Sequence, residues 1–150
     1  MVSQANGAAA LLGGGKAFQR AALVPMAAHA LIVAGLPGAA LLALIDNVEL
    51  MRDEDSLEKA VGISLRTVQR KRADTSDKRL SLEQGGRTWK FAQILARATG
   101  VFGTQADAED WLSRPAMALD QQRPIDLLAT PAGVEIVETF LEQLEFGVYA

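Results

Sequence analysis

Three side chains near the middle of the chain have the types and spacing needed to read DNA bases. Gln69 and Arg70 lie three and four positions after Arg66, so a helix would place all three on one face. An arginine can form paired hydrogen bonds with guanine in the major groove, and a glutamine can do so with adenine. Lys71 and Arg72 follow directly, and their cations could contact phosphates and fix the register on DNA.

The residues around this face fit a helix-turn-helix over positions 57–70. Ala60 is small where two helices would cross, Gly62 allows a tight turn, and Ser64 can cap the second helix. The residues expected to face the core are Ile63, Leu65 and Val68. The full set expected at DNA is Ser64, Arg66, Thr67, Gln69, Arg70, Lys71 and Arg72. A solvated basic helix, packed by its leucine and valine, would have the same composition, so both interpretations stay open.

The distribution of charge separates this segment from the end of the chain. The 150 residues carry a net charge of −3, but residues 62–97 have nine basic and three acidic side chains. Residues 101–150 have two basic and nine acidic side chains. Positive charge attracts phosphates, whereas an acidic surface favours a basic protein. The asymmetry therefore predicts two regions with different partners.

The last expected helix carries an acidic stripe along one side. Its members are Glu135, Glu138, Glu142 and Glu145, which recur every three or four residues. The apolar face of this helix is predicted to consist of Val134, Val137, Phe140, Leu141 and Leu144. An apolar tail that could plug a cleft ends the chain. The residues expected to bind a protein are Glu138, Glu142, Glu145, Phe146, Val148, Tyr149 and Ala150. A solvated acidic face and a frayed end are the alternatives.

The elements that must position these surfaces are all helical, because no segment alternates apolar and polar residues as a strand would. Caps, prolines and glycines predict the following helices: 25–34, 37–48, 56–61, 65–72, 82–99, 105–114 and 131–145. Residues 1–15 are rich in glycine and alanine and are interpreted as a mobile arm. We expect an N-terminal arm and helix over 1–30, a helix-turn-helix domain over 31–100 and a C-terminal domain over 101–150.

Enzymatic chemistry is not expected. Lys16 follows three glycines, but Ala10 and Ala17 replace the glycine and the hydroxyl residue of a phosphate-binding loop. His29 stands alone among apolar residues and is interpreted as packed or capping. The chain has no cysteine, which excludes disulfides and thiolate metal sites and fits the cytoplasm. We therefore expect no catalytic residue, cofactor or metal.

A membrane span is also not expected, although residues 21–45 carry no formal charge. Pro25, Gly35, Pro37 and Gly38 interrupt this apolar stretch. Two short buried helices fit this pattern better than one helix of about 20 residues that crosses a bilayer.

The order of these motifs resembles that of Xre/MbcA/ParS-type antitoxins over residues 10–150. The segments similar to their toxin-binding domain are Trp111-Leu112, 123–128, Thr130, Gly133-Val134 and 145–148. The segments similar to their Xre-like helix-turn-helix region are 62–70 and 98–103, with residues 12–14 resembling its usual opening. The chain departs from the family at Asp120-Gln121, where a glycine pair is frequent, and at Phe146, where a histidine is common.

The resemblance implies an all-α protein with an Xre-like helix-turn-helix domain followed by a small helical toxin-binding domain. It further implies a RES-domain toxin as partner, an enzyme that consumes NAD⁺ and whose active site the antitoxin blocks. It implies repression of the shared operon through operator DNA, by a homodimer whose two recognition helices lie about 34 Å apart. Two other hypotheses remain. One is a transcription regulator with a C-terminal ligand-sensing or dimerisation domain, and the other is an interaction protein with a vestigial helix-turn-helix.

Overall fold

The computed structural model describes residues 3–74 and 78–147, which form helices joined by short connections. In chain order the elements are α1 (Ser3–Leu11), α2 (Lys16–Leu23), α3 (Pro25–Ala34), α4 (Gly38–Asn47), η1 (Glu49–Arg52), α5 (Glu54–Val61), α6 (Leu65–Ala73), α7 (Leu82–Phe102), α8 (Gln105–Ser113), η2 (Met117–Leu119), α9 (Pro124–Leu127) and α10 (Pro131–Glu145). The described elements include no strand, and the all-α prediction is confirmed.

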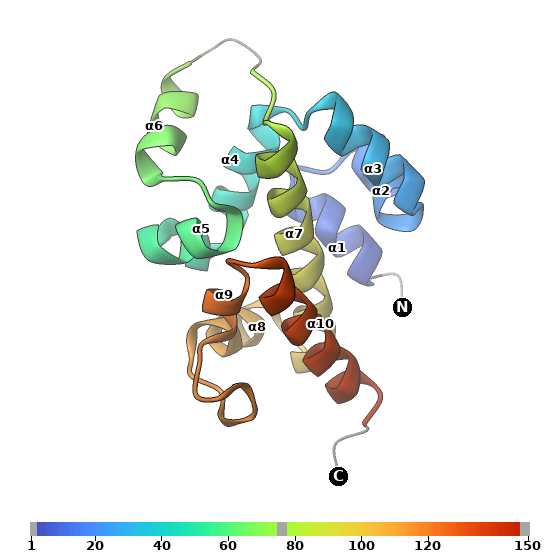
Figure 1. Ribbon diagram of the computed structural model, residues 1–150. Helices are drawn as coiled ribbons and strands as arrows, with labels where there is room; N and C mark the ends of the chain where they lie inside the picture. Colours follow the sequence, from blue (N-terminus) through green and yellow to red (C-terminus); the bar gives the residue numbers. More distant parts are fainter. Residues whose placement is uncertain (1–2, 75–77, 148–150) are drawn as a thin grey trace.

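The long helix α7 runs through the centre of the molecule (Figure 1). Helices α1–α3 lie on one side of it, α5 and α6 lie on the other, and α8–α10 cover its C-terminal half. A capping box starts this helix. The Ser81 hydroxyl accepts a hydrogen bond from the Gln84 amide at 3.1 Å, and the Gln84 side chain accepts one from the Ser81 amide at 3.3 Å. Trp89, Phe91 and Leu95 on α7 are buried and form the centre of the core.

Several other helix boundaries follow the expected caps, but α5 begins at Glu54 rather than at residue 56, α7 ends later than predicted, and α2 is absent from the predicted helices. Thr104 and Thr130 accept hydrogen bonds from the amides of Asp107 and Gly133, as N-caps do. Helix α7 passes Gly100 and ends at Phe102 rather than near Thr99. The ring centroids of Phe102 and Trp111 lie 5.1 Å apart, and this contact stabilises the extra turn of α7.

The predicted mobile arm at the N-terminus is wrong, because residues 3–11 form a helix packed against α7. The small side chains that suggested an arm instead permit close approach: a Cβ on Gly7 would lie 3.2 Å from the Ala96 Cβ. Ala8 and Ala9 are buried. The side-chain amide of Asn47 donates to the carbonyls of the last turn of α1, which closes this end of the helix.

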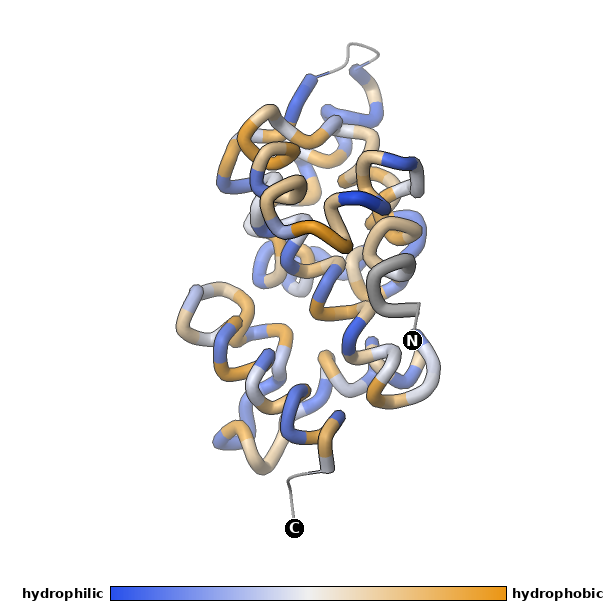
Figure 2. The backbone as a smooth tube through the Cα atoms, turned by 90° about the vertical axis from the view of Figure 1, so that its right-hand side faces the viewer, coloured by the Kyte–Doolittle hydropathy of each residue, from blue (hydrophilic) through white to orange (hydrophobic). Residues whose placement is uncertain are grey.

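Helices α2 and α3 leave several large apolar side chains on the surface. Figure 2 faces the side that these helices cover, and much of their length is coloured as hydrophobic. Leu23 and Met26 are 72% and 73% exposed, and Val33 is 59% exposed. His29 is exposed in the middle of α3, whose caps are Val24 and Gly35, so its interpretation as a packed or capping histidine is wrong. None of the described helices combines the length and the apolar character that a membrane crossing requires.

Helix α7 contains three glycines, Gly85, Gly86 and Gly100, and glycine inside a helix lowers its stability. A Cβ on Gly86 would have the Ile32 Cγ2 at 4.0 Å as its nearest neighbour, so the site has room for a methyl group. Gly86→Ala should therefore raise the free energy of unfolding by about 1 kcal/mol, the helix-interior difference between the two residues. Urea denaturation measures this change. Gly103→Ala is the control, because φ at this position is +99° and the same methyl group should destabilise. A loss of stability in Gly86→Ala would contradict the prediction.

Candidate DNA-binding and partner-binding surfaces

The first helix of the predicted helix-turn-helix, α5, is fixed at both ends. Its N-cap Asp53 accepts hydrogen bonds from the Ser56 amide at 3.0 Å and from the Ser56 hydroxyl at 2.8 Å. These two bonds hold the pKa of the Asp53 carboxyl below its ordinary value. The helix ends at Gly62, whose φ of +71° confirms the tight turn expected at this glycine.

The turn is also held from α7, through Arg87. The Arg87 guanidinium donates to the Lys59 carbonyl at 2.8 Å and so satisfies an acceptor in the last turn of α5. It lies against Gly62 so closely that a Cβ on this glycine would overlap Arg87 Nη1. The sequence alone does not reveal this role, because no local pattern marks an arginine 25 residues after the turn as its neighbour.

The second helix, α6, presents the predicted base-reading face to solvent. Ile63 and Val68 are buried and Leu65 is half-buried, so the apolar residues face the core as expected. Arg66, Gln69 and Arg70 are all exposed. The structure therefore brings together on one open face the three residues that the spacing predicted.

The hydroxyl groups at the start of α6 have structural partners. Ser64 accepts a hydrogen bond from the Thr67 amide at 3.2 Å and lies 3.0 Å from the Thr67 hydroxyl. Arg70 donates to that same hydroxyl at 3.2 Å, a contact that orients the guanidinium along the helix. Ser64 and Thr67 thus cap α6 and position Arg70, whatever else they contact.

The cations that follow differ in availability. Arg72 forms an ion pair with Asp46 of α4 at 2.7 Å, and this contact lowers the pKa of Asp46. Lys71 is half-buried. A phosphate would therefore compete with Asp46 for Arg72. No described carboxylate forms an ion pair with Arg66 or Arg70, so a ligand at their face would displace none.

The C-terminal helices pack around Trp111. Its ring lies 5.1 Å from Phe102 of α7 and 5.7 Å from Phe140 of α10. The predicted apolar face of α10 is confirmed: Val137 and Leu141 are buried, and the half-buried members are Val134, Phe140 and Leu144. Hence α10 is seated on α7 and α8 by its apolar face, and its other side faces solvent.

The acidic stripe on α10 divides into two pairs of residues. Glu138 forms an ion pair with Lys90 at 2.9 Å, and Glu145 forms one with Arg97 at 3.1 Å. Both cations belong to α7, so these glutamates hold α10 in place. Glu135 and Glu142 are exposed. Phe146 is 70% exposed after the helix ends, whereas Val148, Tyr149 and Ala150 lie outside the described residues.

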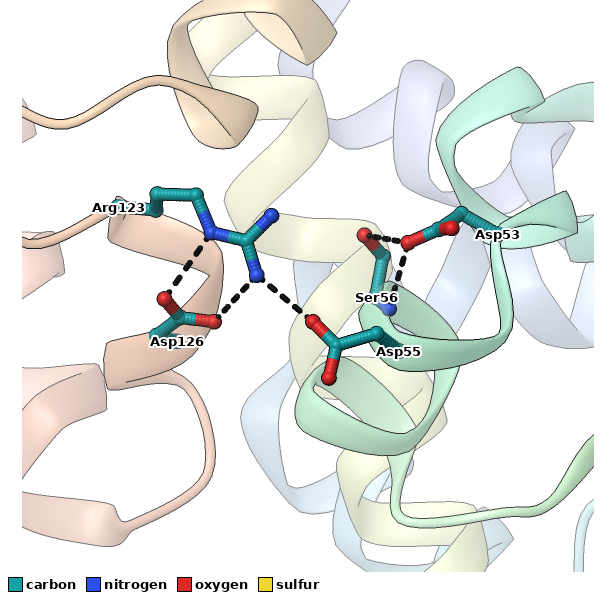
Figure 3. A network of polar contacts seen from close by, with 5 residues as sticks. All are labelled: Asp53, Asp55, Ser56, Arg123 and Asp126. Atoms are coloured by element: carbon teal, nitrogen blue, oxygen red, sulfur yellow. Dashed lines mark hydrogen bonds and ion pairs between the residues drawn. The ribbon is translucent and has the colours of Figure 1, made fainter.

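An ion-pair network joins the C-terminal helices to the helix-turn-helix (Figure 3). Arg123 donates to Asp126 through Nε at 3.0 Å and Nη2 at 2.8 Å. The same Nη2 reaches Asp55 on α5 at 2.7 Å, a contact that the sequence did not reveal. These bonds lower the pKa of Asp126 and raise that of Arg123. The carboxylates therefore lock α9 against the first helix of the helix-turn-helix.

This network predicts a loss of stability in acid. A carboxyl whose pKa is lowered by folding stabilises the fold above its ordinary pKa of 3.8 and loses this contribution as pH falls below that value. Asp126→Asn should lower the free energy of unfolding by about 1 kcal/mol at pH 7, since the contacts are partly exposed. The difference from wild type should vanish near pH 2, as urea denaturation across pH would reveal.

The matched control is Asp120→Asn, which removes an exposed carboxylate nearby. A pH-independent difference for Asp126→Asn, or an equal effect of the control, would contradict this role.

In the described part of the chain, no group of three or more histidine, cysteine, aspartate or glutamate side chains could hold a metal ion. The predicted DNA-binding and partner-binding residues that the structure describes lie on two separate helices, α6 and α10. The exposed face of α6 and the free end of α10 lie at opposite ends of the molecule (Figure 1).

Two family models match successive parts of the chain, one containing α6 and the other containing α10. A model of the antitoxin Xre-like helix-turn-helix domain matches residues 27–93, and a model of the antitoxin Xre/MbcA/ParS C-terminal toxin-binding domain matches residues 97–147. The chain is 31% identical over 110 residues to an Antitoxin Xre of Yersinia enterocolitica, covering 71% of this chain and 73% of that protein.

A second relative, an Antitoxin Xre of Pseudomonas putida, is 34% identical over 71 residues, covering 47% of this chain and 45% of that protein. Helix α6 lies within the segment matched by the helix-turn-helix model, and α10 lies within the segment matched by the toxin-binding model. The chain therefore belongs to the Xre/MbcA/ParS-type antitoxin family.

Proposed function

We propose that this antitoxin neutralises a RES-type, NAD⁺-consuming toxin by blocking its active site, and that it represses its own operon by binding operator DNA. Residues 31–100 would bind DNA and residues 101–150 the toxin, with residues 1–30 supporting the fold. The proposal places the protein in the cytoplasm and gives it no catalytic step and no cofactor. The observation that carries it is the pair of separate surfaces on α6 and α10, within segments that match a helix-turn-helix and a toxin-binding domain.

The exposed face of α6 supports the DNA-binding half of the proposal. Arg66, Gln69 and Arg70 are exposed side chains of the types that hydrogen-bond to base edges, and none of them forms an ion pair with a described carboxylate. Arg72 and Lys71 would add phosphate contacts once Arg72 leaves Asp46. Each phosphate neutralised contributes about −0.9 to the slope of log affinity against log salt, so promoter binding should weaken steeply as salt rises.

The C-terminal end of α10 supports the toxin-binding half. Glu142 and Phe146 are exposed there, one acidic and one aromatic. Glu138 and Glu145 would contribute to the negative potential of this end while they remain paired with α7. We propose that Val148, Tyr149 and Ala150 extend this surface into the toxin.

We further propose that the DNA-binding form is a homodimer. A two-fold axis would present two copies of α6 to successive turns of one DNA face, about 34 Å apart. The exposed apolar side chains of Leu23, Met26 and Val33 support an interface between copies through α2 and α3.

Co-expression with the toxin encoded by the neighbouring gene tests the proposal. Growth should be rescued by the full chain, and deletion of residues 147–150 should impair rescue more than it impairs promoter binding. Failure of rescue with intact promoter binding would favour a transcription regulator without a toxin partner. Equal loss of both activities in the deletion would show that the tail only supports folding.

A further inference from the structure

A cleft between the helix-turn-helix and the C-terminal helices has no role in either proposed activity. Its volume is about 370 Å³, within the range of about 300–1,000 Å³ common for small-molecule sites. Helix α7 forms its floor, Ala60 of α5 forms one wall, and the start of α10 forms the other. The apolar residues that line it are Ala60, Phe91, Ile94, Leu128, Pro131 and Val134.

Of the two cationic side chains that line this cleft, one has an anionic partner among the described residues and the other has none. Lys90 is neutralised by Glu138 at 2.9 Å. Arg87 is half-buried, and no described carboxylate forms an ion pair with it, including Glu83 one turn earlier on α7. Its one hydrogen-bond partner among the described groups is the neutral Lys59 carbonyl. A half-buried guanidinium beside apolar walls therefore remains without a counter-charge, which is a costly arrangement unless an anion binds there.

We infer that this cleft binds a small organic carboxylate with an apolar body. The carboxylate would pair with Arg87, and the apolar body would cover Phe91, Ile94 and Val134. A neutral ligand would leave the guanidinium unmatched, and a cationic one would be repelled by it. The ligand would contact α7, α5 and α10 at once, next to the bond from Arg87 to Lys59 that holds the turn before α6.

Titration of the full chain with three eight-carbon probes tests the site directly. The probes are octanoate, octan-1-ol and octylammonium, followed by amide chemical shifts in NMR spectra. Octanoate should bind saturably and shift the amides of Gly86, Arg87, Ala129 and Val134, and octan-1-ol should bind at least about tenfold more weakly. Absence of saturable octanoate binding at these amides, or equal binding of all three probes, would overturn the inference.

Two variants separate Arg87 from the rest of the cleft. Arg87→Met keeps the length of the side chain and should reduce octanoate affinity about tenfold, to the level of octan-1-ol. The control Lys90→Met/Glu138→Gln removes a neutral pair from the same wall and should retain the preference for octanoate. Loss of the preference in the control but not in Arg87→Met would contradict the assignment. Because the three probes are compared on the unaltered chain, the test does not depend on how well Arg87→Met folds, nor on toxin or DNA binding.

Discussion

Replacing Arg66, Gln69 and Arg70 together by alanine is expected to weaken binding to the promoter by about a hundredfold or more. Each side chain that pairs with a base edge contributes about 1–3 kcal/mol, and these three are the exposed residues of one helix face. Alanine favours helix, so α6 should persist and the unfolding free energy should change little. Gel shifts at several salt concentrations measure the loss, and the salt slope should change little, because the phosphate contacts are assigned to Lys71 and Arg72 and not to these three residues.

Lys16→Ala/Arg20→Ala is the matched control, because it removes two exposed cations from α2 while leaving α6 intact. It should retain nearly all of the promoter affinity. The triple variant should also keep its capacity to neutralise the toxin, since α10 is untouched. An equal loss of DNA affinity in both variants would show that general positive charge, and not the face of α6, binds the promoter.

Gly133→Ala is expected to lower the free energy of unfolding by about 3 kcal/mol, the upper range for forcing atoms into a packed site. Gly133 is buried in the first turn of α10, where a Cβ would overlap the Leu127 carbonyl oxygen. Backbone atoms cannot move aside as a flexible side chain can, so α9 and α10 would separate. Toxin binding should fall with stability, because both helices belong to the C-terminal segment.

Ala132→Gly, one residue earlier and exposed, is the control and should cost about 1 kcal/mol or less. Gly86→Ala makes the same chemical change as Gly133→Ala and should have the opposite sign. Urea denaturation distinguishes the three variants. Stability in Gly133→Ala equal to that of wild type would mean that α9 and α10 approach less closely than described.

The sequence predicts most of the fold because helix caps act locally. Ser64, Ser81, Thr104 and Thr130 each accept a hydrogen bond from an amide three residues later, so each cap depends only on its own neighbours in the sequence. The face of α6 could be predicted for the same reason, since helical spacing determines which side chains lie together.

Contacts between distant segments could not be predicted in this way. The burial of α1 depends on the fit of Gly7 against Ala96, and a glycine- and alanine-rich stretch gives no sign of that partner. The pairing of Glu138 with Lys90, and of Arg123 with Asp55, joins residues 48 and 68 positions apart. Two of the four glutamates in the acidic stripe, Glu138 and Glu145, are therefore paired with cations of α7 and not available to a partner without losing these pairs.

The departure from the family pattern at Asp120-Gln121 has a conformational explanation. Both residues have positive φ, 55° and 64°, the region that a glycine pair enters without strain. Asp is among the residues that tolerate this region best, whereas Gln gains no such advantage. The turn before Arg123 thus has the backbone that glycines favour, although this sequence has no glycine there.

The most direct test of the account is to mix the purified antitoxin with the purified product of the neighbouring toxin gene and follow NAD⁺ consumption. We predict that consumption falls to background as the full chain approaches a stoichiometric amount. We also predict that the Arg66/Gln69/Arg70 triple alanine variant inhibits equally well. Toxin that remains fully active with antitoxin in excess would contradict the central claim, that this chain carries a toxin-blocking surface separate from its DNA-binding face.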